Sequence, residues 1–238
     1  MNKTTLSSWL PVYLLLGTFY LAACSDRSNP ESENPAKTTE QTTSSENNDL
    51  LAVVETDKGT FKMKLRTDIA PMSIANFINL VRRGFYHGKE VAASNRISAS
   101  YGLGEPVPIY NVQNEYSPKL IFDRPGVVAW TFLDTQKGNA NQISHPTRFF
   151  IAKEANDKWN YSYCPFAEVI EGQEVVNGAQ AGDWIKSVRI VGDPEPLMAR
   201  YQDNLAKWNQ ALLLAGHYSP DDLQNKENQI PPPFINSN

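Results

Sequence analysis

Two cysteines and three histidines are the first side chains of this chain to consider as nucleophiles or metal ligands. His87, His145 and His217 lie far apart in the sequence and match no spacing typical of a metal site. Cys164 has no histidine or acidic residue at a spacing that supports thiol catalysis. We therefore expect a buried, inert thiol at Cys164, with no metal site and no cofactor.

The other cysteine, Cys24, ends an N-terminal pattern that predicts lipidation. Lys3 precedes the apolar run Trp9–Leu21, which is too short for an ordinary membrane-spanning helix. The sequence Leu-Ala-Ala-Cys that follows resembles a bacterial lipobox, where the signal peptide is cut before the cysteine and the thiol is acylated. The alternative is a plain secretory signal with a chance cysteine. Ser25 favours the outer membrane over the inner one, so we expect a lipid-anchored envelope protein on the periplasmic side.

Composition divides the rest of the chain into a tether, one domain and a C-terminal extension. The segment after Cys24 is rich in Ser, Thr, Asn, Glu and Pro, a composition that cannot bury a core. Hydrophobic residues make up 41% of the chain, and the net charge of −4 argues against nucleic-acid binding. The expected divisions are a signal peptide at 1–23, a tether at 24–49, a domain at 50–192, a helix at 193–216 and a tail at 217–238.

The elements that must position any site begin with two strands and a helix. Leu51–Thr56 is followed by a Gly-containing turn and by Thr60–Arg66, where apolar and basic residues alternate as in a half-buried strand. Pro71 then suits the first turn of a helix, and two arginines and Gly84 close it. The apolar face of this helix is formed by Ile74, Phe77, Ile78 and Val81.

Beyond His87 the chain is expected to be loop-like until a series of apolar segments begins. Further strands are predicted at Gly126–Leu133, Arg148–Ala152, Phe166–Ile170 and Ile185–Val191, with a short helix in Glu171–Gly178. Asp193 and Pro194 then suit the start of an amphipathic helix of about six turns. Its apolar stripe consists of Leu197, Tyr201, Leu205, Trp208 and Leu212. We expect this stripe to pack on the domain of its own chain, and docking of a partner is the alternative.

Several of these segments together resemble the cyclophilin-type peptidyl-prolyl cis-trans isomerases. The resemblance rests on the order of two strands, ANFINLV and GFYHG within residues 53–88, on RFFI at Arg148–Ile151, which is similar to the family's QFFI, and on PFAEVIEGQEVV at Pro165–Val176. It runs from about Leu50 to Gly192. It implies a mostly-β fold: a closed antiparallel barrel of about eight strands with two capping helices, to which the C-terminal helix is added.

The resemblance also implies the reaction, which is rotation about X–Pro peptide bonds, and it marks the site. The family's catalytic arginine falls at Ala93 in this chain, whereas an arginine, Arg148, stands where the family has the glutamine of QFFI. Arg148 is therefore the first candidate for the catalytic donor and Arg96 the second. Phe150 would line the proline pocket. The other substrate-binding positions implied by the resemblance are Thr131, Gly102 and Trp159.

Two functions follow from a family pattern whose catalytic arginine is missing. The first is an envelope prolyl isomerase of reduced activity, acting on extended proline-containing peptides or unfolded envelope proteins. The second is a catalytically silent module of the same fold that binds peptides or an envelope partner. A third interpretation makes the domain a scaffold for the C-terminal helix. Fold alone does not decide among them, because function belongs to the site.

Overall fold

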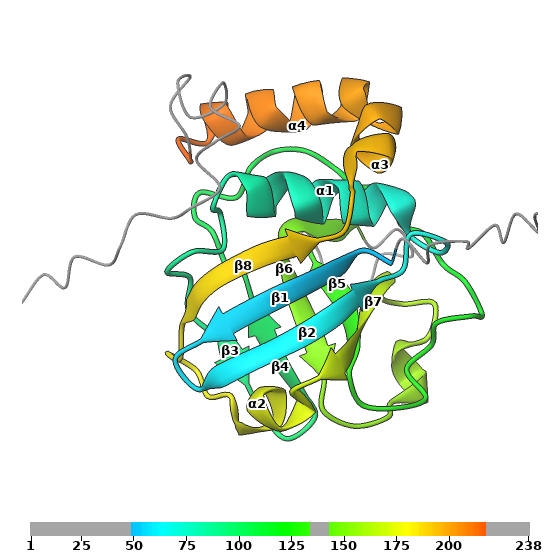
Figure 1. Cartoon of the computed structure of the whole chain (residues 1–238), viewed down its shortest axis with the longest axis vertical. Coiled ribbons are helices and arrows are strands. Elements are labelled where there is room, and N and C mark those ends of the chain that lie inside the picture. Colours follow the sequence, from blue (N-terminus) through cyan, green and yellow to red (C-terminus); the bar gives the residue numbers. More distant parts are fainter. Residues whose placement is uncertain (1–48, 134–142, 218–238) are drawn as a thin grey trace, which may run out of the picture. The chain divides into compact units, whose positions relative to one another are not determined.

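The computed structural model describes residues 49–133 and 143–217, in which one antiparallel sheet is combined with short helices (Figure 1). Cys24, the tether and the tail beyond residue 217 lie outside these residues. The strands pair in the order β3-β4-β6-β5-β7-β2-β1-β8. Their bounds are β1 Leu51–Thr56, β2 Gly59–Leu65, β3 Ala93–Ser94, β4 Ser98–Tyr101, β5 Val127–Phe132, β6 Ser144–Ala152, β7 Pro165–Glu171 and β8 Ile185–Val191. The expected mostly-β architecture of about eight antiparallel strands is confirmed.

The sheet curls around an aromatic core. The Phe61 ring of β2 lies 6.0 Å from the Tyr101 ring of β4, although three other strands separate β2 from β4 in the sheet. In Figure 1 the strands β8, β1 and β2 accordingly lie in front of β4, β5 and β6. The edge strands β3 and β8 share no ladder. A single β-bridge joins Glu90, shortly before β3, to Trp184, directly before β8. Full closure of the barrel stays a prediction.

The helices of the described chain are α1 Pro71–Arg82, α2 Gln173–Gly178, α3 Glu195–Arg200, α4 Gln202–Leu214 and the 3-10 turn η1 Asp157–Trp159. α1 begins at Pro71, as the sequence predicts, and its apolar face is buried. Phe77 on that face contacts the rings of Phe149 on β6 and Phe166 on β7. The helix therefore covers one end of the curled sheet. No helix within the described ranges is long and apolar enough to cross a membrane.

Two expectations about the elements are wrong. The region after His87 is not only loop, because β3 and β4 form there; β3 pairs with β4, and β4 pairs with β6. The C-terminal segment is not one continuous helix, because the backbone of Tyr201 (φ −108°, ψ 20°) separates α3 from α4. The break lets α4 lie along α1, where Asn209 accepts hydrogen bonds from Asn79 Nδ2 at 2.8 Å and from Arg83 Nε at 2.9 Å. Trp208 of α4 is buried, and its ring lies 5.9 Å from the ring of Tyr110 in the connection between β4 and β5.

Candidate active site

The cross-strand register aligns the position of the missing arginine with the predicted pocket residue. Ala93 on β3 is opposite Ser100 on β4, Ser100 is opposite Phe150 on β6, and Phe150 is opposite Ala129 on β5. Residues that are directly opposite share one face of a sheet. Ala93 therefore lies in the same cross-strand row as Phe150 but two strands away from it, because β4 lies between β3 and β6. An alanine cannot donate from there, so any guanidinium at this site must come from elsewhere.

A large bulge in β6 shapes the adjoining part of the site. Trp130 pairs with Phe149 and Phe132 pairs with Ser144, so β5 advances two residues while β6 advances five. His145–Arg148 lie between the two pairs on β6, whereas only Thr131 lies between them on β5. Bulges of this kind re-aim side chains and are over-represented next to active sites. The sequence expectation began this strand at Arg148 and so placed the bulge outside it.

Side chains from other elements hold the backbone of this bulge. Asn76 of α1 donates from Nδ2 to the Pro146 carbonyl at 2.7 Å, and the Tyr86 hydroxyl donates to the Thr147 carbonyl at 3.1 Å. Both bonds are buried. Since buried carbonyls without partners are costly, these contacts fix the path of the chain through the bulge.

Arg148 emerges from the end of the bulge, two residues before Phe150 and on the same face of β6. The side chain is half-buried, and within the described part of the chain its Nε atom is buried without a hydrogen-bond partner. His145 lies beside it and is 5% exposed. Burial first, and the positive charge of Arg148 second, lower the pKa of His145 to about 4. The imidazole is therefore neutral near pH 7, and of these two side chains only Arg148 carries a positive charge.

Aromatic rings cover Phe150, which is 4% exposed. Phe122 stacks on it with the ring centroids 5.8 Å apart, and Trp159 and Tyr163 meet it edge-on at 5.2 and 4.8 Å. Phe122 itself is fully buried. The wall predicted to receive a proline ring is thus occupied by side chains of the protein. A proline reaching Phe150 must displace at least one of these rings.

The remaining candidate residues divide into two places. The Thr131 hydroxyl donates to the Arg148 carbonyl at 3.2 Å. Gly102, with φ +77°, lies so close to the bulge that a Cβ there would come within 2.6 Å of the Thr147 carbonyl oxygen. Arg96, in contrast, lies in the turn between β3 and β4, where its side chain is 81% exposed and pairs with Glu154 at 2.6 Å. The structure gathers Arg148, Thr131, Gly102, Phe150 and Trp159, and leaves Arg96 at the hairpin turn.

Sequence reasoning missed three contributors to the site. Phe122 and Tyr163 cover Phe150, and no motif or spacing marks them in advance. His145 was weighed as a metal ligand alone. The signal that could have singled it out is its place three residues before Arg148, because a side-chain acceptor can receive the backbone N–H groups of the residues two and three positions later.

Cys164 lies outside this chemistry. It is buried, and its thiol donates to the Glu115 carbonyl at 3.1 Å while accepting the Glu115 backbone N–H at 3.1 Å. Burial is the main cause that raises its pKa above the usual value, so the group is a thiol and not a thiolate near neutral pH. Within residues 49–133 and 143–217, no three His, Cys, Asp or Glu side chains gather in a way that could hold a metal ion.

The chain is similar to known prolyl isomerases over the length of this domain. The family model described as "Cyclophilin type peptidyl-prolyl cis-trans isomerase/CLD" matches residues 51–193. A peptidyl-prolyl cis-trans isomerase of Synechococcus elongatus is 27% identical over 149 residues, which cover 60% of this chain and 97% of that protein. Peptidyl-prolyl cis-trans isomerase B of Bacillus subtilis is 24% identical over 141 residues, covering 57% of this chain and 94% of that protein.

Among solved structures, a cyclophilin type peptidyl-prolyl cis-trans isomerase of Cryptosporidium parvum superposes with a TM-score of 0.53. The match covers 61% of this chain and 99% of that chain at 21% sequence identity, so it speaks for the fold. The family model spans more than half of the 238 residues and includes every strand of the sheet. The chain therefore belongs to the cyclophilin-type peptidyl-prolyl cis-trans isomerase family, a family of isomerases.

Proposed function

We propose that this chain is a prolyl isomerase of reduced activity that acts on X–Pro bonds in extended peptides, with Arg148 as the hydrogen-bond donor. One observation carries the proposal. Arg148 supplies a permanently charged guanidinium two residues before Phe150 on β6, and its Nε–H is buried without a partner in the described chain. A buried donor without a partner is costly, so a shift of the side chain that lets a bound substrate accept from this N–H would remove that cost.

The chemistry requires no covalent step. An amide resists rotation by about 18–20 kcal/mol because its nitrogen is conjugated with the carbonyl. As the bond twists, the prolyl nitrogen loses conjugation and becomes a better hydrogen-bond acceptor. A donor aimed at that nitrogen is bound more strongly in the transition state than in the ground state, and only such an interaction raises the rate of the chemical step.

Two features support a reduced rate. The register leaves Ala93 in the row of Phe150, so the family's own donor position is empty and Arg148 must act from a different strand. Losing one preorganised donor typically costs about 2.7–4 kcal/mol, a hundred- to a thousandfold in rate. The rings over Phe150 add the cost of their displacement to every binding event.

The test is an isomerisation assay on a proline-containing peptide with the wild-type chain, Arg148→Ala and Arg96→Ala. The two arginines are a matched pair, because one lies in the site and the other in the hairpin turn. We expect measurable activity in the wild type, a loss of about a hundredfold in Arg148→Ala, and no change in Arg96→Ala. Full activity in Arg148→Ala would remove the assignment of the donor.

The second candidate function is a silent peptide-binding module, and the aromatic cover of Phe150 favours it. Three rings already cover the apolar surface of Phe150 that a catalytic cyclophilin site would offer to proline. A wild-type chain that binds proline peptides without accelerating their isomerisation would support this module and end the enzyme proposal.

We further propose that the domain is tethered to the periplasmic side of a bacterial envelope membrane through an acylated Cys24, where unfolded envelope proteins would supply its substrates. The support is the Leu-Ala-Ala-Cys pattern after a short apolar run. Mass spectrometry of the mature N-terminal peptide tests this, with Cys24→Ser as the control. An unacylated wild-type peptide would contradict the anchor.

A further inference from the structure

The backbone N–H groups of Thr147 and Arg148 share a single acceptor, the Nδ1 atom of His145. The distances are 3.2 Å from Thr147 N and 3.0 Å from Arg148 N. Because Nδ1 accepts, it carries no proton, and the ring hydrogen of the neutral imidazole is on Nε2. The low pKa of this buried ring agrees with that state. The imidazole thus binds two backbone amides of the bulge to which it belongs.

We propose that His145 is the positioning residue of the site, and that it sets the direction of the Arg148 side chain by holding the Thr147 and Arg148 amides. This inference rests on the proposed role of Arg148 as donor. His145 touches neither the peptide nor the prolyl nitrogen in this account. It acts through the backbone of Arg148, one bond away from the carbon that carries the guanidinium side chain.

The same arrangement occurs a second time in the chain with a different acceptor. Asn95 Oδ1 receives the N–H groups of Ile97 and Ser98 at 2.8 and 2.9 Å in the turn between β3 and β4. The spacing, two and three residues after the acceptor, equals that at His145. An asparagine therefore performs this backbone task in the same protein, which identifies His145→Asn as the substitution that keeps the geometry.

Other contacts of the bulge fix its carbonyls and not these two amides. Asn76 and Tyr86 hold the carbonyls of Pro146 and Thr147 from outside. Without an acceptor at position 145, the buried amide of Thr147 and the partly buried amide of Arg148 must find new partners, and the chain must move to reach them. A displacement of about 1 Å in a catalytic group can cost a hundredfold in rate.

The experiment compares His145→Leu with His145→Asn in the full chain. Leucine fills a similar space without an acceptor, whereas asparagine restores one. We expect kcat/KM for a proline peptide to fall about ten- to a hundredfold in His145→Leu and to stay near wild type in His145→Asn. Asn95→Leu is the matched control, because it removes a pair of backbone N–H bonds of the same spacing away from the site and should leave kcat/KM unchanged. The Thr147 hydroxyl, 3.4 Å from His145 Nδ1, has no counterpart at Asn95.

Two further measurements separate positioning from general damage. In an Arg148→Ala background, His145→Leu should lower kcat/KM no further, because the group it positions is already gone. The NMR signal of the Arg148 Nε–H should move or exchange faster in His145→Leu and keep its wild-type position in His145→Asn. The NMR measurement does not depend on enzymatic activity. An inactive wild type would therefore end the enzyme proposal, and the NMR signal would still test whether His145 positions Arg148.

Three results would overturn the positioning role. The first is a His145→Leu variant with wild-type kcat/KM and an unmoved Arg148 signal. The second is an equal loss in His145→Asn, since the restored acceptor should rescue. The third is a further drop on adding His145→Leu to Arg148→Ala, because His145 would then act independently of the arginine.

Discussion

Glu115 places its carboxylate against the N-terminus of α1, where Oε2 accepts the backbone N–H of Ser73 at 2.9 Å. Oε1 accepts the N–H of Met72 at 3.1 Å. The helix has no cap from its own residues and no acidic residue in its first turn. The carboxylate from a distant loop therefore supplies both the acceptor and the negative charge that this end of a helix requires.

We predict that Glu115→Gln lowers the free energy of unfolding by about 1–2 kcal/mol, as the loss of a charged cap does elsewhere. Glutamine keeps one acceptor oxygen but loses the charge. Glu105→Gln is the control, because Glu105 is an exposed residue in the same connection between β4 and β5. Urea unfolding of the two variants and the wild type measures the difference. Equal midpoints for the two variants would contradict the cap.

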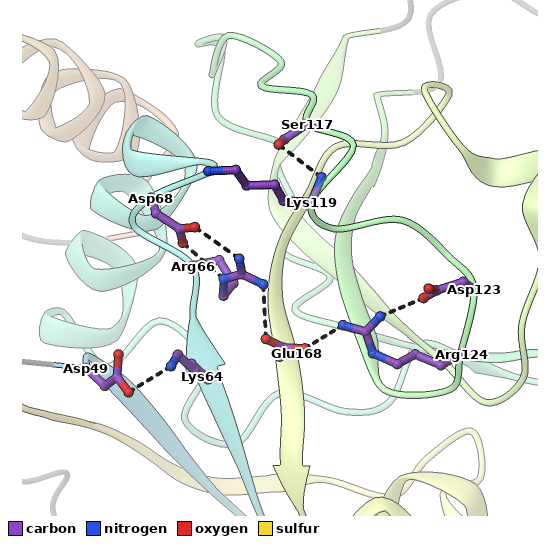
Figure 2. Close-up of polar contacts among 9 residues, drawn as sticks. All are labelled: Asp49, Lys64, Arg66, Asp68, Ser117, Lys119, Asp123, Arg124 and Glu168. Atoms are coloured by element: carbon purple, nitrogen blue, oxygen red, sulfur yellow. Dashed lines mark hydrogen bonds and ion pairs between the residues drawn. The ribbon is translucent and has the colours of Figure 1, made fainter. Parts of the chain in front are cut away.

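A carboxylate on β7 is shared by two arginines, one directly after the end of β2 and one in the loop before β5 (Figure 2). Glu168 on β7 accepts from Arg66 at 3.2 Å and from Arg124 at 2.7 Å. Arg66 also forms a double contact with Asp68, whose pKa it lowers below the usual value through that hydrogen bond. Arg66 is 16% exposed and Arg124 is 45% exposed.

The difference in exposure predicts a difference in energy. In double-mutant cycles of unfolding free energy, we expect Glu168 to couple more strongly to Arg66 than to Arg124, because exposed ion pairs are typically worth about 0–1 kcal/mol and are screened by salt. Arg66→Met and Arg124→Met, each combined with Glu168→Gln, provide the two cycles. A coupling to Arg124 that is larger and insensitive to about 0.5 M salt, roughly three times the physiological ionic strength, would reverse the ranking.

The low pKa of His145 makes stability depend on pH in a defined window. The folded pKa is about 4 and the ordinary value is 6.5. Between these values the unfolded chain binds a proton that the folded chain does not, so the free energy of unfolding falls as the pH falls. The contribution is fully present above pH 6.5 and is lost as the pH falls through the folded pKa.

Comparison with His145→Asn isolates this effect, because asparagine keeps the acceptor and does not titrate. We expect the wild type to lose more stability than the variant between the two pKa values, by up to about 1.4 kcal/mol per pH unit. NMR titration of His145 in Arg148→Ala should show a higher pKa than in the wild type, since one of its two causes is removed. Parallel stability curves for wild type and His145→Asn would contradict the buried neutral ring.

Local patterns predicted the parts of this fold that depend on neighbouring residues. The apolar face of α1 follows from a three- and four-residue spacing, and the β1–β2 hairpin from the alternation in β2 and the Gly-containing turn before it. β4 was missed because Ser98–Tyr101 alternates small and polar residues and becomes a strand only by pairing with β6. The break at Tyr201 has no Gly or Pro to mark it, and packing of α4 on α1 accounts for it.

The site shows the same division. The motif register selected Arg148 and Phe150, because a family pattern is read along the sequence. The bulge from His145 to Arg148 is a property of two strands in register, five residues against two, and no single segment displays it. The cover of Phe150 by Phe122 joins residues from different loops and strands. These tertiary relationships decide whether the site can act, and they lie beyond what spacing can predict.

The stacked pair of Phe122 and Phe150 leads to the last prediction, in which shortening one ring opens the other to substrate. Phe122 is fully buried, and beside it lies a small pocket that Tyr116, Leu120 and Tyr161 help to line. Removing most of the Phe122 ring leaves a cavity against Phe150, and apolar cavities of ring size bind apolar rings. A proline ring could then reach Phe150 without displacing the protein's own side chain.

We therefore expect Phe122→Ala to bind a proline peptide more tightly and to isomerise it with a higher kcat/KM than the wild type. The same change should cost about 3–5 kcal/mol of stability, as Phe→Ala substitutions in cores do. Phe122→Val is the milder variant in case the first does not fold. Leu120→Ala is the control, because it also removes buried apolar volume but leaves the stacked pair in place.

Thermal unfolding with and without peptide should show a larger peptide-induced rise in Tm for the Phe122 variants than for the control, since a ligand that binds only the folded state stabilises it. Equal rises in all variants, with unchanged kcat/KM, would mean that the rings over Phe150 do not limit access and that proline binds elsewhere.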